Sequence, residues 1–159
     1  LNPKFPRGMD TVKNTGFNYR MSELQAAVGL AQIKKINFIL KENKKRYFVL
    51  KKIISKKFKI RKCHENTLPS YDTFIFRVEN SNLRKKIVKL LKSEKIGTKN
   101  LPDAIKWHFA SYWKHALKKK EIDRLKSSLQ HLQNHIAIPI LLKKNMSIYR
   151  KIADKIINL

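Results

Sequence analysis

The side chains of this chain that could take part in chemistry are few, and most of its histidines stand late in the sequence. They are His108, His115, His131 and His135. His131 and His135 are four residues apart, a spacing that can place two metal ligands on one face of a helix. No carboxylate or cysteine stands at ligand spacing beside them, and we expect a helix to end between them. The pattern therefore favours surface or interface histidines and predicts no metal site.

An aromatic segment, WHFASYW at residues 107–113, contains His108. Aromatic side chains at this density usually belong to a core. Asp103, Lys106 and His108 give the segment a polar edge, which suits a sugar-like ligand or the active site of a partner subunit. Interleaved aromatic and basic residues also suit the stacking of nucleotides. The segment alone does not separate these interpretations.

Familiar catalytic patterns are absent from the sequence. It contains no glycine-rich phosphate loop, no Ser-His-Asp order and no pair of carboxylates suited to general acid and base catalysis. The 11 acidic residues are scattered along the chain. The residues by themselves therefore identify no catalytic group.

The charge of the chain raises nucleic acid as a partner. The formal net charge is +26 over 159 residues, and a dense positive field attracts polyanions. Only 8 of the 37 basic residues are arginine, however, and arginine is the residue that more often reads bases or grips phosphates bidentately. The lysines also fall all along the chain, mostly on the polar side of amphipathic stretches. We therefore favour solvated surfaces over a nucleic-acid interface.

The composition fits one folded domain, because 42% of the residues are hydrophobic. A single cysteine, Cys63, excludes an internal disulfide, and no apolar run is long enough to span a membrane. These features predict a cytoplasmic protein. The chain also begins without methionine, in a proline-containing segment, which suggests a fragment.

The pattern of apolar residues predicts the elements that must position these side chains. Residues 1–20 read as an irregular lead-in, and Ser22 with Gln25 matches a capping box at the start of a helix. The expected helices cover residues 22–56, 83–95, 118–132 and 146–157, with a locally helical stretch at 102–117. The expected strands cover residues 58–63, 71–78 and 135–140, with a strand or extended segment at 96–101. The order predicts an α+β fold: a long N-terminal helix leading into a small mixed or antiparallel sheet packed with helices.

The block GFNYRMSELQAAVGLAQIKKI, residues 16–36, differs in composition from the chain around it. It resembles the block G-x-N-Y-R-M-S-E-L-Q-A-A-x-G-x-x-Q-L-x-x-L of the DegT, DnrJ and StrS family of sugar aminotransferases, which use pyridoxal 5'-phosphate. Ile33 and Ile36 stand where the family block has leucines. Later landmarks follow in the family's order: His108 in an aromatic loop, the short strand at 136–140, and a final helix with a Met-Ser start.

This resemblance implies the C-terminal small domain of a fold-type-I transaminase more than twice as long as this chain. Residues 1–56 would be the end of the large-domain segment and the connecting helix, and residues 57–159 the small α+β domain. The missing upstream part would carry the Schiff-base lysine, the carboxylate that pairs with the pyridine nitrogen, and most phosphate contacts. No catalytic residue is then expected in this chain, which would be inactive alone.

The resemblance also implies roles for individual residues. Asn18 would reach across a homodimer to the phosphate of the partner's cofactor, and Arg20 would lie close to the same site, although a salt bridge at the helix start is the alternative for Arg20. His108 would lie near the sugar. The Asn18–Ala31 region would form the dimer interface, because its small residues allow close approach of a second backbone.

The function implied is amino transfer, with glutamate as the expected donor, to a keto sugar or nucleotide-linked keto sugar in polysaccharide or cell-surface sugar biosynthesis. Two alternatives stay open. One is a small basic nucleic-acid-binding domain, and the other is a family relative that has lost its catalytic lysine.

Overall fold

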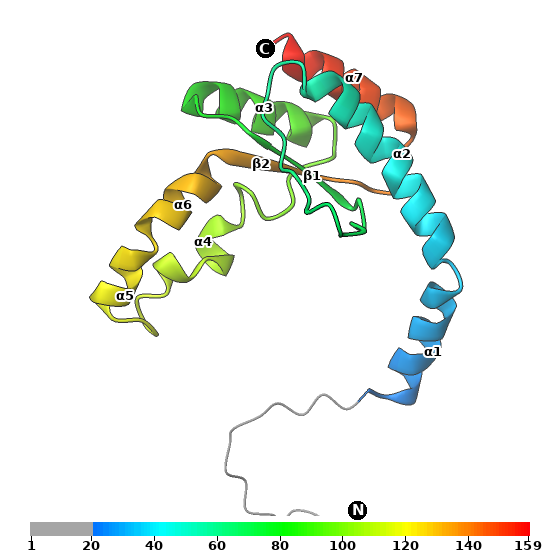
Figure 1. Cartoon of the computed structure of the whole chain (residues 1–159), viewed down its shortest axis with the longest axis horizontal. Coiled ribbons are helices and arrows are strands. Elements are labelled where there is room, and N and C mark those ends of the chain that lie inside the picture. Colours follow the sequence, from blue (N-terminus) through cyan, green and yellow to red (C-terminus); the bar gives the residue numbers. More distant parts are fainter. Residues whose placement is uncertain (1–20) are drawn as a thin grey trace, which may run out of the picture. The chain divides into compact units, whose positions relative to one another are not determined.

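The structure is a computed structural model that describes residues 21–159. The chain divides into two units, one ending at Lys35 and one running from Ile36 to Leu159, and each is described by itself. The elements are α1 (Glu23–Ile33), α2 (Ile36–Ile54), β1 (Thr73–Arg77), α3 (Ser81–Ser93), α4 (Ile105–His108), the 3-10 helix η1 (Ala110–Tyr112), α5 (Lys119–Arg124), α6 (Lys126–Gln133), β2 (His135–Pro139) and α7 (Met146–Ile157) (Figure 1). No helix within residues 21–159 is both long and apolar enough to cross a membrane.

The centre of the second unit is an antiparallel pair of strands, β1 and β2. In their register Phe74 lies opposite Ile138, and Phe76 lies opposite Ile136. All four side chains are fully buried. Aromatic and β-branched side chains pack well across a pleated surface, which explains why these two segments pair.

Three helices cover the buried face of this sheet. Figure 1 shows α2, α3 and α7 on one side of β1 and β2. Their fully buried core side chains are Leu50, Ile54, Ile87, Leu91, Tyr149, Ile152, Ala153 and Ile156. Burying one large aliphatic or aromatic side chain contributes about 1.5–3 kcal/mol. Burial of these side chains therefore stabilises the packing of the three helices on the sheet, while the lysines between these positions stay exposed.

Irregular segments run along both outer edges of the sheet. On the β1 edge, Arg61 N donates to Ile75 O at 3.0 Å, and Arg77 N donates to Lys59 O at 2.8 Å. On the β2 edge, Lys99 N donates to Ala137 O at 2.8 Å. Ala137 N donates in turn to the carbonyl of Leu101, at 3.1 Å. The loop after α3 is thereby fixed beside β2.

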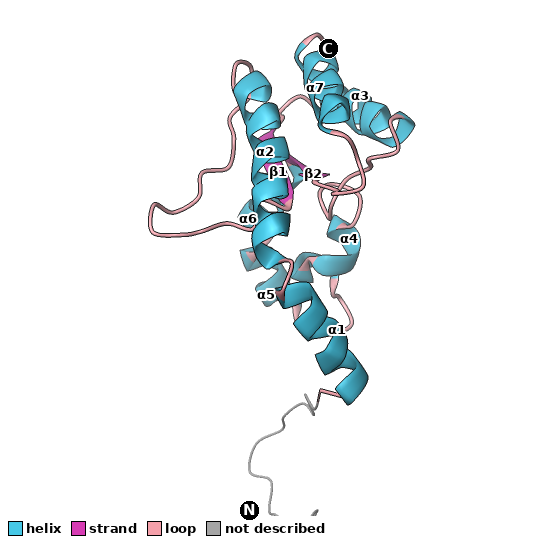
Figure 2. Cartoon of the chain, turned by 90° about the vertical axis from the view of Figure 1, so that its right-hand side faces the viewer, coloured by secondary structure: helices cyan, strands magenta, loops and turns pink. Residues whose placement is uncertain are grey.

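The predicted α+β fold is confirmed, but some predicted elements are shorter. The helix expected over residues 22–56 is divided into α1 and α2, because Lys35 N bonds Gln32 O and tightens the last turn to 3-10 geometry. The strand expected at 58–63 reduces to one bridge, between Ile60 and Phe76. Figure 2 shows the chain between α2 and β1 looping out beside α2, which leaves little of it in register with the sheet.

One further prediction needs correction. The helix expected over residues 118–132 is two helices, α5 and α6, because Leu125 N bonds Ile122 O in a 3-10 turn. Helix α7 begins at Met146, as predicted, and the side chain of the residue before it, Asn145, makes no capping hydrogen bond. The predicted division of the chain into residues 1–56 and 57–159 stays a prediction.

Candidate functional site

The described part of the sequence block at residues 16–36 begins with a capped helix. Ser22 Oγ accepts a hydrogen bond from Gln25 N at 3.3 Å, and Gln25 Oε1 accepts one from Ser22 N at 2.9 Å. The predicted capping box is therefore confirmed. Asn18 and Arg20, the predicted cofactor-binding residues, lie outside the described residues.

Helix α1 carries an apolar surface that nothing in the described chain buries. None of its residues is buried, and the side chains of Leu24, Val28 and Ile33 are 77%, 54% and 65% exposed. A Cβ atom added to Gly29 would meet no heavy atom within 4 Å. The small residues of this helix thus leave room for a second surface to approach.

The predicted sugar-binding residue, His108, is the last residue of the short helix α4. The side chain of Ile105 in this helix is buried, whereas that of His108 is exposed. Its neighbour Trp107 is 80% exposed, so the aromatic segment is only partly a core element. Within residues 21–159 the imidazole of His108 has no hydrogen-bond partner, which leaves it available to a ligand.

Two carboxylates hold the loop that leads to α4. Asp103 accepts a hydrogen bond from Thr98 Oγ1 at 3.0 Å and pairs with Lys92 at 3.1 Å. Asp72 pairs with Lys99 across the edge of the sheet. The hydrogen bond from Lys99 is the main cause that lowers the pKa of the Asp72 carboxyl below its ordinary value. The loop between α3 and α4 is therefore tied at two points.

A small cavity of about 220 Å³ with a mixed polar and apolar lining lies at this edge of the sheet. Its walls come from the end of α2, the segments on both sides of the sheet, and the start of β1. The lining residues are Tyr47, Arg61, Cys63, Pro69, Ser70, Tyr71, Asp72, Thr73, Ile75, Lys99, Asn100, Leu101 and Ala137. His108 does not line it, so the structure does not bring the predicted sugar-binding residue into this cavity.

The four late histidines do not form a cluster suited to a metal. The rings of His131 and His135 lie 4.5 Å apart, and His135 Nδ1 lies 2.7 Å from the carbonyl oxygen of His131. Burial lowers the pKa of His135. In the part of the chain that the structure describes, no group of three or more metal-binding side chains occurs.

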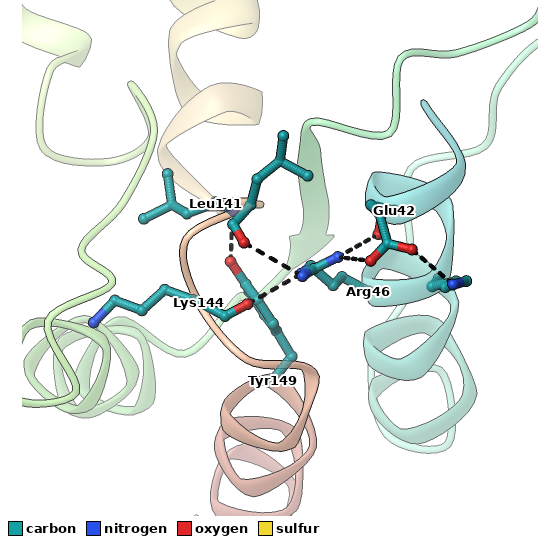
Figure 3. A network of polar contacts seen from close by, with 7 residues as sticks. Glu42, Arg46, Leu141, Lys144 and Tyr149 are labelled. Carbon is teal, nitrogen blue, oxygen red and sulfur yellow. Dashed lines mark hydrogen bonds and ion pairs between the residues drawn. The ribbon is translucent and has the colours of Figure 1, made fainter. Parts of the chain in front are cut away.

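Sequence reasoning missed a buried arginine that ties α2 to the loop before α7 (Figure 3). Arg46 is only 9% exposed. Its guanidinium donates to Lys144 O at 3.2 Å, to Leu142 O at 3.4 Å, and to the carbonyl and carboxylate of Glu42 at 2.9 and 2.8 Å. The spacing of Glu42 and Arg46, four residues apart on a helix, is the signal that could have marked this residue.

Tyr149 completes this network from the side of α7. Its hydroxyl accepts a hydrogen bond from Leu141 N at 2.6 Å and donates to Pro139 O at 3.3 Å. Burial raises the pKa of this tyrosine. Arg46 and Tyr149 together fix the chain that leaves β2 within the unit that runs from Ile36 to Leu159.

A family model and several solved structures match this chain. The family model described as the DegT/DnrJ/EryC1/StrS aminotransferase family matches residues 4–156. Helicobacter pylori PseC, an aminotransferase involved in the biosynthesis of pseudoaminic acid, is similar in structure, with a TM-score of 0.64 and 19% sequence identity. The similarity covers 93% of this chain and 40% of PseC. A search of curated proteins found no match.

The Streptococcus pneumoniae protein Spr1654, a candidate sugar aminotransferase, is also similar. The apo form of Spr1654 gives a TM-score of 0.58 at 16% identity, and the similarity covers 87% of this chain and 36% of Spr1654. The PMP form of Spr1654 gives a TM-score of 0.56 at 16% identity, and the similarity covers 86% of this chain and 36% of Spr1654. At these identities the likeness shows the fold. The chain spans about two fifths of the length of PseC and a smaller share of Spr1654.

Proposed function

Because the chain belongs to the DegT/DnrJ/EryC1/StrS aminotransferase family, we propose that it is the C-terminal part of a pyridoxal-phosphate-dependent sugar aminotransferase. The observation that carries this proposal is the family match across residues 4–156. The share of PseC that the chain covers, 40%, agrees with a part of a longer enzyme. The location that we propose is the cytoplasm.

The reaction that we propose moves an amino group from glutamate to a keto sugar or nucleotide-linked keto sugar, in the synthesis of cell-surface sugars. Aminotransferases of this family depend on pyridoxal phosphate. When bound, this cofactor supplies an electron sink for the carbon atom at which the amino group is exchanged. The residues of this chain would contribute binding and orientation.

The described residues do not by themselves fit the cofactor. The carboxylates at the sheet edge already have partners, since Asp72 pairs with Lys99 and Asp103 with Lys92. We propose that Asn18 and Arg20 contact the cofactor phosphate of the partner subunit, and that the part of the enzyme outside this chain makes the other cofactor contacts. An amide N–H is a good donor to a phosphate dianion, and the charged guanidinium of Arg20 is a stronger one.

The role proposed for His108 is contact with the sugar. Its imidazole is exposed and has no partner within residues 21–159, and the exposed ring of Trp107 stands beside it in sequence. An imidazole can donate to or accept from a sugar hydroxyl. In the enzyme that includes the upstream region, H108A should raise KM for the sugar and leave cofactor absorbance unchanged.

The partner proposed for α1 is a second copy of the chain, through the Asn18–Ala31 region. Exposed apolar side chains on a helix with small residues support this proposal. The double variant L24D/V28D should therefore shift the enzyme from dimer to monomer in sedimentation. A control with the same change in net charge on the exposed face of α5, K119Q/K120Q, should leave the dimer intact.

A direct test begins with the upstream coding region. The full product is purified with pyridoxal phosphate, and cofactor absorbance and amino transfer from glutamate to keto sugars are measured. Absorbance together with transfer supports the proposal. Cofactor absorbance without transfer to any keto sugar would favour a non-catalytic relative, and the absence of both would reject the proposal.

A further inference from the structure

A second and larger pocket lies between the C-terminal half of α2 and the loop that follows it. Its volume is about 770 Å³. It is lined by Tyr47, Phe48, Lys51, Ser55, Lys56, Lys57, Phe58, Lys59, Ile60, Arg61, Lys62, Cys63, Thr67, Pro69 and Tyr71. The loop that forms one wall is the one seen beside α2 in Figure 2.

The charge of this pocket is of one sign. Its lining includes five lysines and Arg61 but no carboxylate. None of these six cations makes an ion pair with another residue in the described chain. Elsewhere in the same unit, lysines such as Lys99 and Lys155 do pair with carboxylates. The pocket therefore keeps a positive field that its own residues do not neutralise, and an anion would neutralise it.

An aromatic wall stands next to these cations. The ring of Tyr47 lies 5.9 Å from that of Phe48 and 5.1 Å from that of Tyr71, and Phe48 and Tyr71 lie 5.9 Å apart. Lys51 Nζ lies 5.3 Å from the ring of Phe48. Phe48 is 43% exposed, so part of this wall is open to a planar ligand. Aromatic side chains beside cations are the usual means of holding a nucleotide base next to its phosphates.

The backbone of Tyr71 is held in an unfavourable conformation. Its φ angle is 54°, in the left-handed region that bulky residues rarely adopt. Such a conformation costs about 1–3 kcal/mol and persists only where the surrounding structure enforces it. Here Asn43 Nδ2 donates to the carbonyl of Ser70 at 3.2 Å, and Ser70 Oγ donates to Asp72 at 2.9 Å. These bonds hold the ring of Tyr71 in the pocket wall, and strain of this kind is concentrated at ligand sites.

We propose that this pocket binds a nucleoside polyphosphate, with the base against the Phe48–Tyr71 wall and the phosphate chain along the cations between Lys51 and Lys62. The site shares no residue with those assigned to cofactor, sugar or dimer contacts. The proposal does not rest on the aminotransferase activity. A pocket bounded by α2 on one side and by the segment from Ser55 to Tyr71 on the other suits one nucleotide better than a continuous strand of nucleic acid.

The test is calorimetric titration of the 159-residue chain with ATP, with inorganic tripolyphosphate and with an oligothymidylate, without magnesium. ATP should bind in 50 mM salt and bind more weakly as salt is raised. The triple variant K51Q/K59Q/K62Q should lose affinity for ATP and tripolyphosphate by on the order of a hundredfold. This loss corresponds to about fivefold for each charge pair in water.

Two controls separate the proposed site from general attraction to a basic chain. K114Q/K119Q/K120Q removes the same charge from exposed positions outside the pocket and should leave ATP affinity nearly unchanged. F48L should lower the affinity for ATP by about tenfold, because base stacking is lost, and leave the affinity for tripolyphosphate unchanged.

Three results would overturn the proposal. They are equal losses in the two triple variants, an ATP affinity that F48L does not change, and binding of the oligothymidylate more tightly than ATP. Circular dichroism of each variant shows whether its fold is kept, and all the variants replace exposed side chains.

Discussion

Replacing Arg46 by methionine should destabilise the unit that runs from Ile36 to Leu159 by about 3 kcal/mol. Methionine keeps much of the apolar stem but leaves three main-chain carbonyls, of Glu42, Lys144 and Leu142, without their charged donor. A net contribution of about 1 kcal/mol for each bond gives the total. The ion pair with the Glu42 carboxylate is left out of this sum, because solvent reaches that carboxylate.

The measurement is urea unfolding followed by far-ultraviolet circular dichroism at 25 °C, with free energies extrapolated to water. The matched control is K45Q. Lys45 binds the same carboxylate at 2.6 Å, but its side chain is 48% exposed. An exposed pair contributes little, so this variant should lose less than about 0.5 kcal/mol. A thermal scan of R46M should show a midpoint lower by about 10 °C.

The reasoning would be refuted if R46M lost less than about 1 kcal/mol, or if K45Q lost as much as R46M. The first result would mean that water replaces the guanidinium at the loop carbonyls without cost. The second would mean that the carboxylate of Glu42, rather than the loop, is the group that Arg46 stabilises.

Three other predictions test separate features of the chain. S22A should remove about 1 kcal/mol from the start of α1 and speed amide exchange at Gln25, whereas S22T should preserve protection. The pKa of Asp72 lies below its ordinary value because of Lys99, so its stabilisation is complete near neutral pH and is lost as pH falls through that lowered pKa. Unfolding of D72N across the acid range should therefore differ from the parent chain most at pH 7, and the difference should shrink as pH falls through the lowered pKa of Asp72. I138A should cost about 3 kcal/mol in urea unfolding, because Ile138 is fully buried, and a loss under 1 kcal/mol would contradict the assignment of the core.

The sequence predicted best the elements whose own pattern determines them. α7 was expected at its observed bounds, and α3 begins where Asn80 accepts hydrogen bonds from Asn82 N and Leu83 N. β1 and β2 were also expected, because aromatic and β-branched residues mark both. Regular spacing of apolar residues carries this information directly.

The parts that the sequence did not predict depend on partners distant in the chain or on local hydrogen bonds. No glycine or proline marks the breaks at Lys34 and Leu125, so the apolar spacing alone suggested unbroken helices. Apolar and basic side chains alternate over residues 58–63 as they do in a strand, but only Ile60 pairs with β1, and the sequence does not show how much of the segment lies beside that strand. Arg46 looked like any other basic residue, since its burial depends on carbonyls almost a hundred positions away.

The candidate site was predicted only in part for a similar reason. The sequence singled out His108 and its exposed aromatic neighbourhood, and the structure gives its place at the end of α4. The pocket beside α2 was not predicted, because it is assembled from a helix, a looped segment and the strained residue Tyr71. Residues of three separate segments meet there only after folding.

The segments that run along both edges of the sheet also bear on the solubility of the chain. A strand with an unpaired edge is a template on which another chain can add and begin an aggregate. In this unit Ile75, in the middle of β1, accepts a hydrogen bond from Arg61, and Arg77, at the end of β1, donates one to Lys59. Ala137, in the middle of β2, bonds to Lys99 and Leu101. Part of each outer edge is thus covered, and three of these four covering residues carry charge. The isoleucine-rich core therefore folds around two short strands whose edges are partly covered, which lowers their tendency to pair with another chain.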